Sequence, residues 1–329
     1  MSRPNNRARA NAVNGPSLGG DPVPKALPPV FRLQSIERLP GEPRSVVNRA
    51  VLFHERASLC VSWISATVDT RLHIGCLVSV RWLGRPISCA GTIQISRLVP
   101  MQHPQSGVNV FDTIPTNWVR ERALMARAQE LVRQLDPPAQ ALLNTIFWDG
   151  GRFQRFLVGP SSLNGHHNGL HGNLIHSIEV AEQAGRMAQN RPGVAMGTLI
   201  AAALLHDAGK SDEYRFDSDR NRFVISDRGA LIGHRNTLIE WLGEARLKCP
   251  IPLKPERYIS LLHALTAVRG APSWLGLREP RSEEAVILST ADRMSGQMEL
   301  MDRQRPAKAG FGRFHSQLGM RPFFPAQDR

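Results

Sequence analysis

An apolar run that ends in two adjacent polar side chains constrains this chain more than any other feature. Residues 195–205 are almost wholly apolar and rich in Ala and Leu, and His206 and Asp207 follow them directly. A helix that is hydrophobic on all sides belongs inside a core, so the run predicts a buried helix, which we expect Gly209 to cap. Burying a lone carboxylate is costly, whereas a divalent cation satisfies an adjacent imidazole and carboxylate together. The dyad therefore predicts a metal site.

Further ligands must come from other helices, because consecutive helical residues point about 100° apart. One candidate, His176, flanks an apolar face within residues 172–181. Another, Asp292, follows Ala291 at the end of a second apolar run, residues 285–292. The predicted metal ligands are His176, His206, Asp207 and Asp292.

Three further segments surround these ligands in a recognisable order. His166-His167 precede His176, which follows ten residues after His166, as in a segment HH…GGLLEH. Residues 229–234 look like G-x-L-I-G-H, and residues 285–292 look like A-x-I-L-x-x-A-D. In this order the chain resembles the HD-domain metal-dependent phosphohydrolases, and among them the YhaM-type 3′→5′ exoribonucleases.

The resemblance implies roles for residues beyond the four ligands. It places His166 and His167 near the active site, and His234 at a second metal site or in substrate binding. Lys210 is a candidate phosphate contact, and the alternative is an exposed lysine without a role. For His234 the alternative is a core histidine whose hydrogen bonds are satisfied. The predicted catalytic residues are His206, Asp207, Lys210 and His234; the predicted substrate-binding residues are His166, His167, Lys210, His234 and Arg269. Asp212, Glu213 and Asp217 are expected in a solvated loop.

The chain departs from the family pattern after His263. Where YhaM-type proteins have H-x-x-x-S-H-H-G, this chain has Val268 and Arg269 in place of the paired histidines. Valine cannot ligate a metal, and arginine stays protonated, so it would repel a second cation while remaining able to clamp a phosphate. We therefore expect one metal to be held firmly and a second weakly or not at all.

Five short β-prone runs occupy residues 31–102, separated by polar or glycine-bearing turns. They are residues 31–36, 50–53, 58–64, 77–82 and 92–95. This number of strands suits a small barrel, for which an OB-fold is the natural candidate and an SH3-like barrel the alternative. Trp63, Arg81 and Trp82 are candidate nucleic-acid contacts on the barrel, although tryptophans in small barrels often lie in the core.

The expected fold class is α+β, with an N-terminal OB-like β-barrel followed by an all-α HD domain. Residues 116–135 have apolar side chains at helical spacing and are predicted to form a helix that Pro137-Pro138 ends; residues 139–148 form the next. The predicted organisation is a disordered basic N-terminus (1–29), the barrel (30–105), a helical bridge (106–159), the HD domain (160–303) and a basic tail (304–329), also expected to be disordered.

The formal net charge of +13 is what a polyanion-binding protein would carry, although a solubilising charge is the alternative. No apolar run approaches the length of a membrane span, and the N-terminus has no apolar segment typical of a secretory signal. The four cysteines show no zinc-finger spacing and are expected to be reduced, mostly buried thiols. We therefore expect a cytoplasmic protein with no membrane partner.

These observations predict a metal-dependent hydrolase of phosphodiester bonds in single-stranded RNA or DNA, specifically a 3′→5′ exoribonuclease or exonuclease. Manganese is the leading metal, and iron, nickel, cobalt, zinc or magnesium also suit histidine and carboxylate ligands. One alternative is a nucleotide phosphohydrolase. Another is a nucleic-acid-binding accessory factor, or a conjugative-element DNA-processing protein, with a degenerate HD site. The sequence leaves homo-oligomerisation open.

Overall fold

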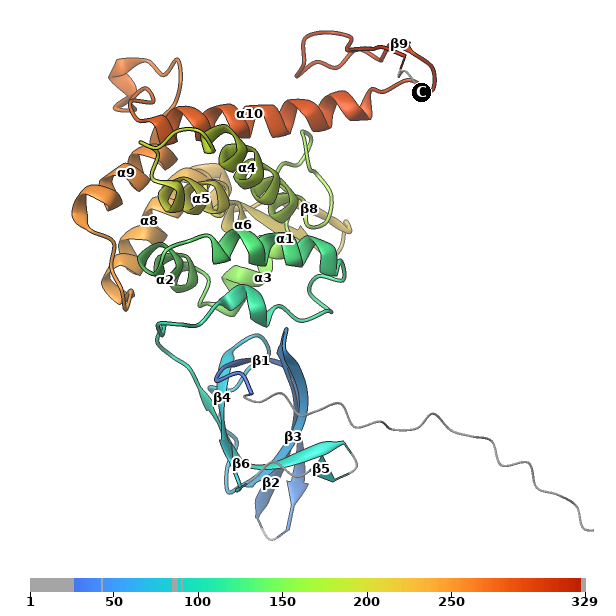
Figure 1. The fold of residues 1–329 in the computed structure, drawn as a ribbon. Coiled ribbons are helices and arrows are strands. Elements are labelled where there is room, and N and C mark those ends of the chain that lie inside the picture. Colours follow the sequence, from blue (N-terminus) through green and yellow to red (C-terminus); the bar gives the residue numbers. More distant parts are fainter. Residues whose placement is uncertain (1–26, 43, 85–87, 90, 327–329) are drawn as a thin grey trace, which may run out of the picture.

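The computed structural model describes residues 27–326, except residues 43, 85–87 and 90. Most of the segment predicted to be a disordered N-terminus, residues 1–26, lies outside the described residues. A β-barrel comes first, and a larger helical region follows it (Figure 1). The predicted α+β class, an OB-like barrel before a helical region, is confirmed.

The barrel closes because its third and last long strands pair in parallel. The sheet order is β3-β2-β1-β4-β6-β5, and an additional β3–β6 pairing joins the two ends. Each of the five predicted runs lies within one of the long strands, and short β5 is added beside β6. The strands are β1 (Phe31–Gly41), β2 (Ser45–His54), β3 (Ala57–Ser65), β4 (Leu77–Trp82), β5 (Ser88–Cys89) and β6 (Thr92–Pro100).

Alternate side chains of these strands fill the barrel, as the period of two residues in a strand requires. Leu33, Leu52 and Trp63 belong to this core, and Trp63 is only 5% exposed. Its ring therefore cannot stack on a base, which corrects the predicted nucleic-acid contact. Trp82 is partly buried against the same core, whereas Arg81 is exposed.

Three helices and a 3-10 turn bridge the barrel to the later helices. They are η1 (Val110–Thr113), α1 (Arg122–Arg133), α2 (Pro137–Ile146) and α3 (Gly150–Val158). The helix expected from residue 116 begins only at Arg122. Pro137 and Pro138 do not merely end a helix: they open α2, where a missing backbone N–H loses no helical hydrogen bond. Helix α3 was not predicted.

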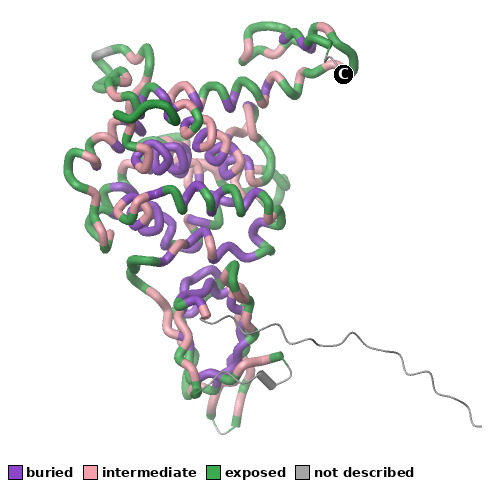
Figure 2. Tube along the Cα trace, viewed as in Figure 1, coloured by how far each residue is buried: buried purple, intermediate pink, exposed green. Residues whose placement is uncertain are grey.

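The remaining helices pack around one long apolar core. Helix α5 lies inside it with residues 198–205 all buried, as its composition predicts (Figure 2). A two-stranded hairpin, β7–β8, interrupts the helices, so this region is not all-helical as expected. The elements are α4 (Gly172–Ala188), α5 (Met196–Leu205), α6 (Lys210–Glu213), β7 (Tyr214–Asp217), β8 (Arg222–Ile225), α7 (Asp227–Leu231), α8 (Gly233–Lys248), α9 (Pro255–Thr266), η2 (Ser273–Leu275) and α10 (Glu283–Arg303).

The barrel and the helical region meet around Arg32 of β1, which is fully buried. Its guanidinium donates to the Gly75 carbonyl at 2.7 Å and to the Thr113 carbonyl at 3.2 Å. Its Cζ atom also lies 5.1 Å from the centre of the Trp118 ring. Gly150, at the start of α3, is required here, because a Cβ atom on it would lie 2.2 Å from the Gly75 oxygen. The two parts are therefore closely docked.

The basic tail is ordered as far as residue 326, contrary to the expectation of disorder. Strands β9 (Gly310–Phe311) and β10 (Phe323–Phe324) pair in antiparallel fashion beyond the end of α10 (Figure 1). Phe324 is buried, and Arg305 stacks over its ring at 4.3 Å. This aromatic packing gives the segment a fixed structure that its charge alone did not predict.

Two expectations concern the environment of the chain. Within the described residues, every helix falls short of the length and apolarity needed to cross a membrane. Cys76 is buried and Cys249 half-buried, but Cys60 is exposed, so the thiols are less buried than expected. The structure gives no burial for Cys89.

Candidate metal centre

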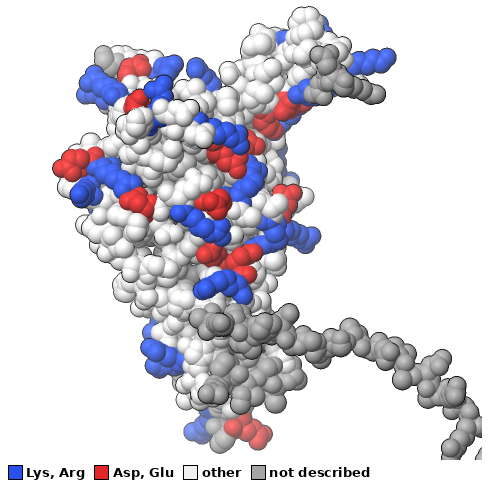
Figure 3. All heavy atoms as spheres, viewed as in Figure 1, with Lys and Arg blue, Asp and Glu red and all other residues white. Residues whose placement is uncertain are grey.

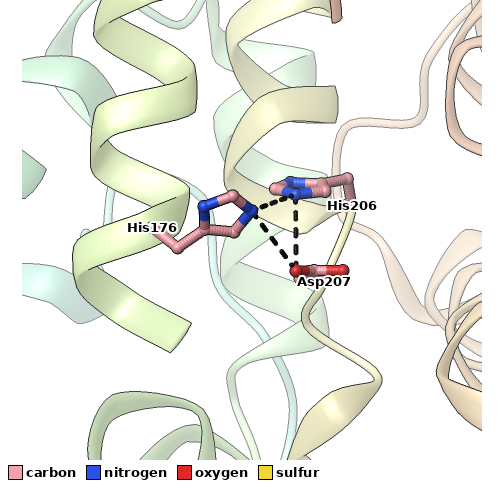
Figure 4. Close-up of side chains that lie close together, drawn as sticks. All are labelled: His176, His206 and Asp207. Carbon is pink, nitrogen blue, oxygen red and sulfur yellow. Dashed lines mark hydrogen bonds and ion pairs between the residues drawn. The ribbon is translucent and has the colours of Figure 1, made fainter. Parts of the chain in front are cut away.

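The end of buried helix α5 carries the predicted dyad into contact with α4. His206 caps the helix and Asp207 follows it, while His176 projects from α4 toward both (Figure 4). His176 is fully buried, and the side chains of His206 and Asp207 are 9% and 8% exposed. Within the described residues, these three side chains form a group able to hold a metal ion.

The distances between the candidate ligand atoms fit a single small cation. His176 Nε2 lies 3.2 Å from His206 Nε2, and each of these nitrogens lies 3.5 Å from Asp207 Oδ2. Metal–nitrogen and metal–oxygen bonds are about 2.0–2.2 Å, so ligand atoms around one ion lie roughly 3.0–3.5 Å apart. The three atoms therefore have the mutual spacing of ligands to one ion.

Asp292 joins the group from the middle of α10, as the fourth predicted ligand. Its Oδ1 atom lies 3.1 Å from His176 Nε2 and 3.6 Å from His206 Nε2. The Asp292 side chain is 39% exposed, in contrast to the other three. The cluster is therefore closed by α4 and α5 and opens toward solvent beside Asp292, where a substrate can approach.

Hydrogen bonds at the Nδ1 atoms turn the Nε2 atoms of both histidines toward the cluster. Ser295 donates its hydroxyl hydrogen to Glu179 at 2.7 Å, so its oxygen accepts from His176 Nδ1 at 3.0 Å. His206 Nδ1 donates to the Ala203 carbonyl at 2.8 Å. In a neutral ring with its proton on Nδ1, Nε2 would have a lone pair for a metal, which is the usual arrangement around metal-binding histidines.

The charges of the group depend strongly on one another. Burial by itself would lower the pKa of His206, but Asp207 and Asp292 outweigh it and raise that pKa to about 9. Burial lowers the pKa of His176, against the effect of its hydrogen bond with Asp292. Burial would raise the pKa of Asp207, but Lys210 and His206 hold it well below its usual range. The carboxylates of Asp207 and Asp292 thus lie beside positive charge, and a bound cation could supply such charge.

The turn after the dyad is fixed by a close backbone approach. Gly209 has φ −62°, a right-handed conformation, and precedes α6, so it is not the left-handed helix cap that the sequence suggested. A Cβ atom on Gly209 would lie 2.0 Å from the His234 carbonyl oxygen. Glycine is therefore needed because α8 begins directly against the dyad.

His234 lies at the edge of the site and is oriented by an acid. Glu213 accepts hydrogen bonds at 2.7 Å from both the His234 backbone N–H and its ring Nδ1. This directs His234 Nε2 to within 3.6 Å of Asp207 Oδ1. Glu213, expected in a solvated loop, is thus a positioning residue that the sequence analysis missed.

Lys210 is also part of the site rather than an exposed lysine. Its ammonium lies 2.6 Å from Asp207 Oδ2, and its side chain is only 11% exposed. Ser161, which was not predicted, lies beside both groups, at 3.3 Å from Lys210 Nζ and 3.4 Å from Asp207 Oδ2. Asn173 donates to the Asp207 backbone carbonyl at 3.2 Å and was also missed.

The paired histidines lie beside the cluster. The ring centre of His166 lies 4.8 Å from that of His176, and burial lowers the pKa of His166 to about 4, so it is uncharged near neutral pH. His167 contacts Glu179 at 3.1 Å, the carboxylate that supports Ser295. His166 is therefore suited to accept a hydrogen bond rather than to bind phosphate as a cation.

The structure does not bring Arg269 and His263 into the cluster. Arg269 is exposed just after α9, and among the described contacts none joins it to the four candidate ligands. His263 Nε2 accepts from the backbone N–H of Arg281 at 2.9 Å. The predicted phosphate clamp at Arg269 therefore has no structural support, whereas the number of metals remains a prediction.

Comparison with known proteins supports the class of this site. The HD domain family matches residues 173–296, a range that contains the dyad, His176, His234 and Asp292. This match supports an HD-domain phosphohydrolase, and HD domains generally bind divalent metals and act as metal-dependent hydrolases. Searches of curated proteins and of solved structures find no match. The finer likeness to YhaM-type exoribonucleases thus rests on the sequence motifs alone.

Proposed function

We propose that this chain is a metal-dependent phosphodiesterase that acts on single-stranded nucleic acid, in the 3′→5′ exonuclease manner of the family it resembles. The convergence of His176, His206 and Asp207 on one point, with Asp292 at its open side, carries this proposal. A bound divalent cation would lower the pKa of a water molecule and neutralise charge that develops on a phosphoryl oxygen.

The surrounding residues have roles that their contacts suggest. Lys210 places a positive charge beside Asp207, where it can meet a phosphate oxygen. His234, held by Glu213 and 27% exposed, can hand a proton to a leaving oxygen. Neutral His166 can accept a hydrogen bond from a water molecule or a sugar hydroxyl. These groups complete a site that can bind a phosphate and protonate a leaving oxygen.

The proposal of a nucleic-acid substrate depends on the barrel and on the net charge of the chain. A closed OB-like barrel is a common single-strand-binding module, and the chain carries an excess of positive charge. On the face drawn in Figure 3, basic and acidic side chains are interspersed over the helical region rather than segregated. The described part of this face therefore has no continuous basic stripe along which a nucleic-acid strand could bind.

One observation favours a nucleotide phosphohydrolase as the second candidate. Trp63 is buried in the barrel core, so the barrel loses one of the aromatic rings expected to hold a strand. A mononucleotide needs only the metal centre and its immediate surroundings. The two candidates therefore differ in whether hydrolysis requires a chain of nucleotides.

The test uses purified full-length protein with Mn²⁺ and four labelled substrates: RNA and DNA strands, each labelled at either end. We expect 5′-labelled strands to shorten stepwise and 3′-labelled strands to release a mononucleotide at once. His206→Gln and Asp207→Asn should reduce the rate by at least about 100-fold, since the metal supplies much of the barrier lowering. Asp302→Asn, at an exposed ion pair on α10, is the matched control.

Other results would contradict the proposal in distinct ways. Phosphate release from mononucleotides with intact strands would indicate the nucleotide phosphohydrolase. Strands that bind but stay intact with every metal would indicate an accessory factor with a degenerate site. Equal rates in His206→Gln and the native protein would remove the metal centre from the reaction.

A further inference from the structure

A groove beside the metal centre has no role in the function proposed so far. It lies between the loop that carries His166 and His167 and the hairpin β7–β8, and its volume is about 590 Å³. Small-ligand sites typically measure about 300–1,000 Å³. Its lining includes Leu163, Asn164, Asn168, Leu170, Phe216 and Phe223.

Both walls of this groove are attached to the metal centre. On one side, His166 and His167 stand between Leu163 and Asn168 in the same loop. On the other, β7 starts directly after Glu213, whose carbonyl accepts from Ser226 N at the end of the hairpin at 2.9 Å. An extended strand rises about 3.3 Å per residue, so Phe216 lies within roughly 10 Å of Glu213. One nucleotide can therefore reach from the centre into the groove.

The hairpin wall presents an aromatic surface to the groove. Phe216 and Phe223 are directly opposite each other in the β7–β8 pair, with ring centres 5.3 Å apart at 71°. Phe216 is 53% exposed, and neither ring belongs to the two apolar cores of the described chain. The exposed ring of Phe216 and the half-buried ring of Phe223, on a separate two-stranded sheet, thus form an aromatic face that the apolar cores do not cover.

The loop wall is polar where the hairpin wall is aromatic. Asn164 and Asn168 are both exposed on it. Arg303 donates to Asn168 Oδ1 at 3.1 Å, which leaves the amide NH₂ of Asn168 directed elsewhere. A nucleobase has a flat face for stacking and a polar edge for hydrogen bonds, and single-stranded bases are recognised in this way. An aliphatic ligand would leave these amides without partners.

We infer that this groove binds a base of the substrate whose phosphate lies at the metal centre. Phe216 stacks on the base, Phe223 supports the Phe216 ring edge-on, and Asn164 and Asn168 bond to the edge of the base. The inference rests on the proposed function and deepens it, because it makes the base, and not only the phosphate, a determinant of substrate choice.

The first test compares a dinucleoside phosphate with its abasic analogue, a diester of the same two sugars that has no base and no aromatic ring. The readout is the ratio of the two kcat/KM values for native protein, Phe216→Leu and Phe216→Tyr. Loss of one base–aromatic stack corresponds to roughly a 5- to 100-fold fall. We expect this fall in Phe216→Leu, which keeps apolar bulk without a ring, and a retained ratio in Phe216→Tyr. The control Ile259→Ala removes another exposed apolar side chain, from α9.

An unchanged ratio in Phe216→Leu, with both substrates hydrolysed, would overturn the inference and leave the proposed function intact. Hydrolysis of neither diester by native protein would instead count against the proposed function. The groove is then judged by binding alone, which needs no catalysis.

That second test is saturation-transfer NMR of adenosine and uridine with full-length, metal-free protein. We expect transfer to the base protons with native protein, Phe216→Tyr and Ile259→Ala, and its loss with Phe216→Leu. No transfer with native protein, or equal transfer in all variants, would overturn the inference. So would a native dimer that Phe216→Leu converts to monomer without any nucleoside signal, because the occupant would then be a second copy of the chain.

Discussion

At the scale of single residues, the candidate centre depends on hydrogen bonds at the outer nitrogens of its histidines. Ser295 accepts the Nδ1 proton of His176 and so directs its Nε2 atom to the cluster, and Ser295 is in turn fixed by Glu179. Without the Ser295 oxygen, the His176 ring loses the bond that selects its tautomer and orientation. The affinity for metal therefore depends on residues that support the ligands as well as on the ligands themselves.

Ser295→Ala should therefore weaken metal binding by about 10- to 100-fold while leaving the protein folded. Titration with Mn²⁺ followed by calorimetry measures the effect, and circular dichroism checks the fold. Ser289→Ala is the matched control, since that hydroxyl on the same helix bonds only to the Val286 carbonyl of its own turn. Equal affinities for the two variants would show that Ser295 does not orient the ligand.

Some of these supporting residues could have been found from the sequence and others could not. Glu179 and Ser295 each lie three residues after a predicted ligand, His176 and Asp292, and this spacing places them on the same helix face. Glu213 gave no such signal, because its contact with His234 spans 21 positions and depends on how α6, the hairpin and α7 turn. Helical spacing predicts neighbours within an element, not across a turn.

At the scale of elements, the dyad is held by the contact of its turn with the start of α8. Gly209→Ala would drive a Cβ atom into the His234 carbonyl, at 2.0 Å, and backbone cannot yield as a flexible side chain does. We expect a loss of stability of about 1–3 kcal/mol and weaker metal binding. Gly243→Ala within α8 meets nothing within 4 Å, so it should be neutral or stabilise by about 0.5–1 kcal/mol.

Thermal unfolding of these two glycine variants gives the comparison. If Gly209→Ala melted at the native temperature and kept its metal, the approach of α8 to the dyad would not be required. The five long barrel strands were predictable from β-prone runs separated by turns, and α5 was predictable from a run that is apolar on all sides. The hairpin β7–β8 was not, because its four-residue strands are too short for a pattern and expose their aromatic face.

At the scale of the whole molecule, Arg32 joins the barrel to the helical region. It satisfies the Gly75 carbonyl on one side and Thr113 on the other, and stacks with Trp118. Arg32→Met would keep much of the volume but leave those carbonyls without donors, at a cost of about 1–3 kcal/mol. Arg49→Met, whose side chain is 62% exposed, should change stability little.

Urea unfolding, monitored by tryptophan fluorescence, measures this effect. We expect a lower midpoint for Arg32→Met, since Trp118 reports directly on the interface. Equal midpoints for the two arginine variants would mean that the barrel is attached by its connecting chain and apolar contacts alone. The sequence offered no sign of this contact, because β1 alternation does not distinguish an arginine in an interface from one in solvent.

The central claim is that His176, His206, Asp207 and Asp292 together hold one catalytic cation. Calorimetric titration of metal-free protein with Mn²⁺ tests it most directly, with Asp207→Asn as the isosteric variant and Asp302→Asn as the control. The account predicts close to one Mn²⁺ per chain for the native and control proteins, and at least about 100-fold weaker binding for Asp207→Asn. No binding by native protein, or the same isotherm for Asp207→Asn, would contradict it.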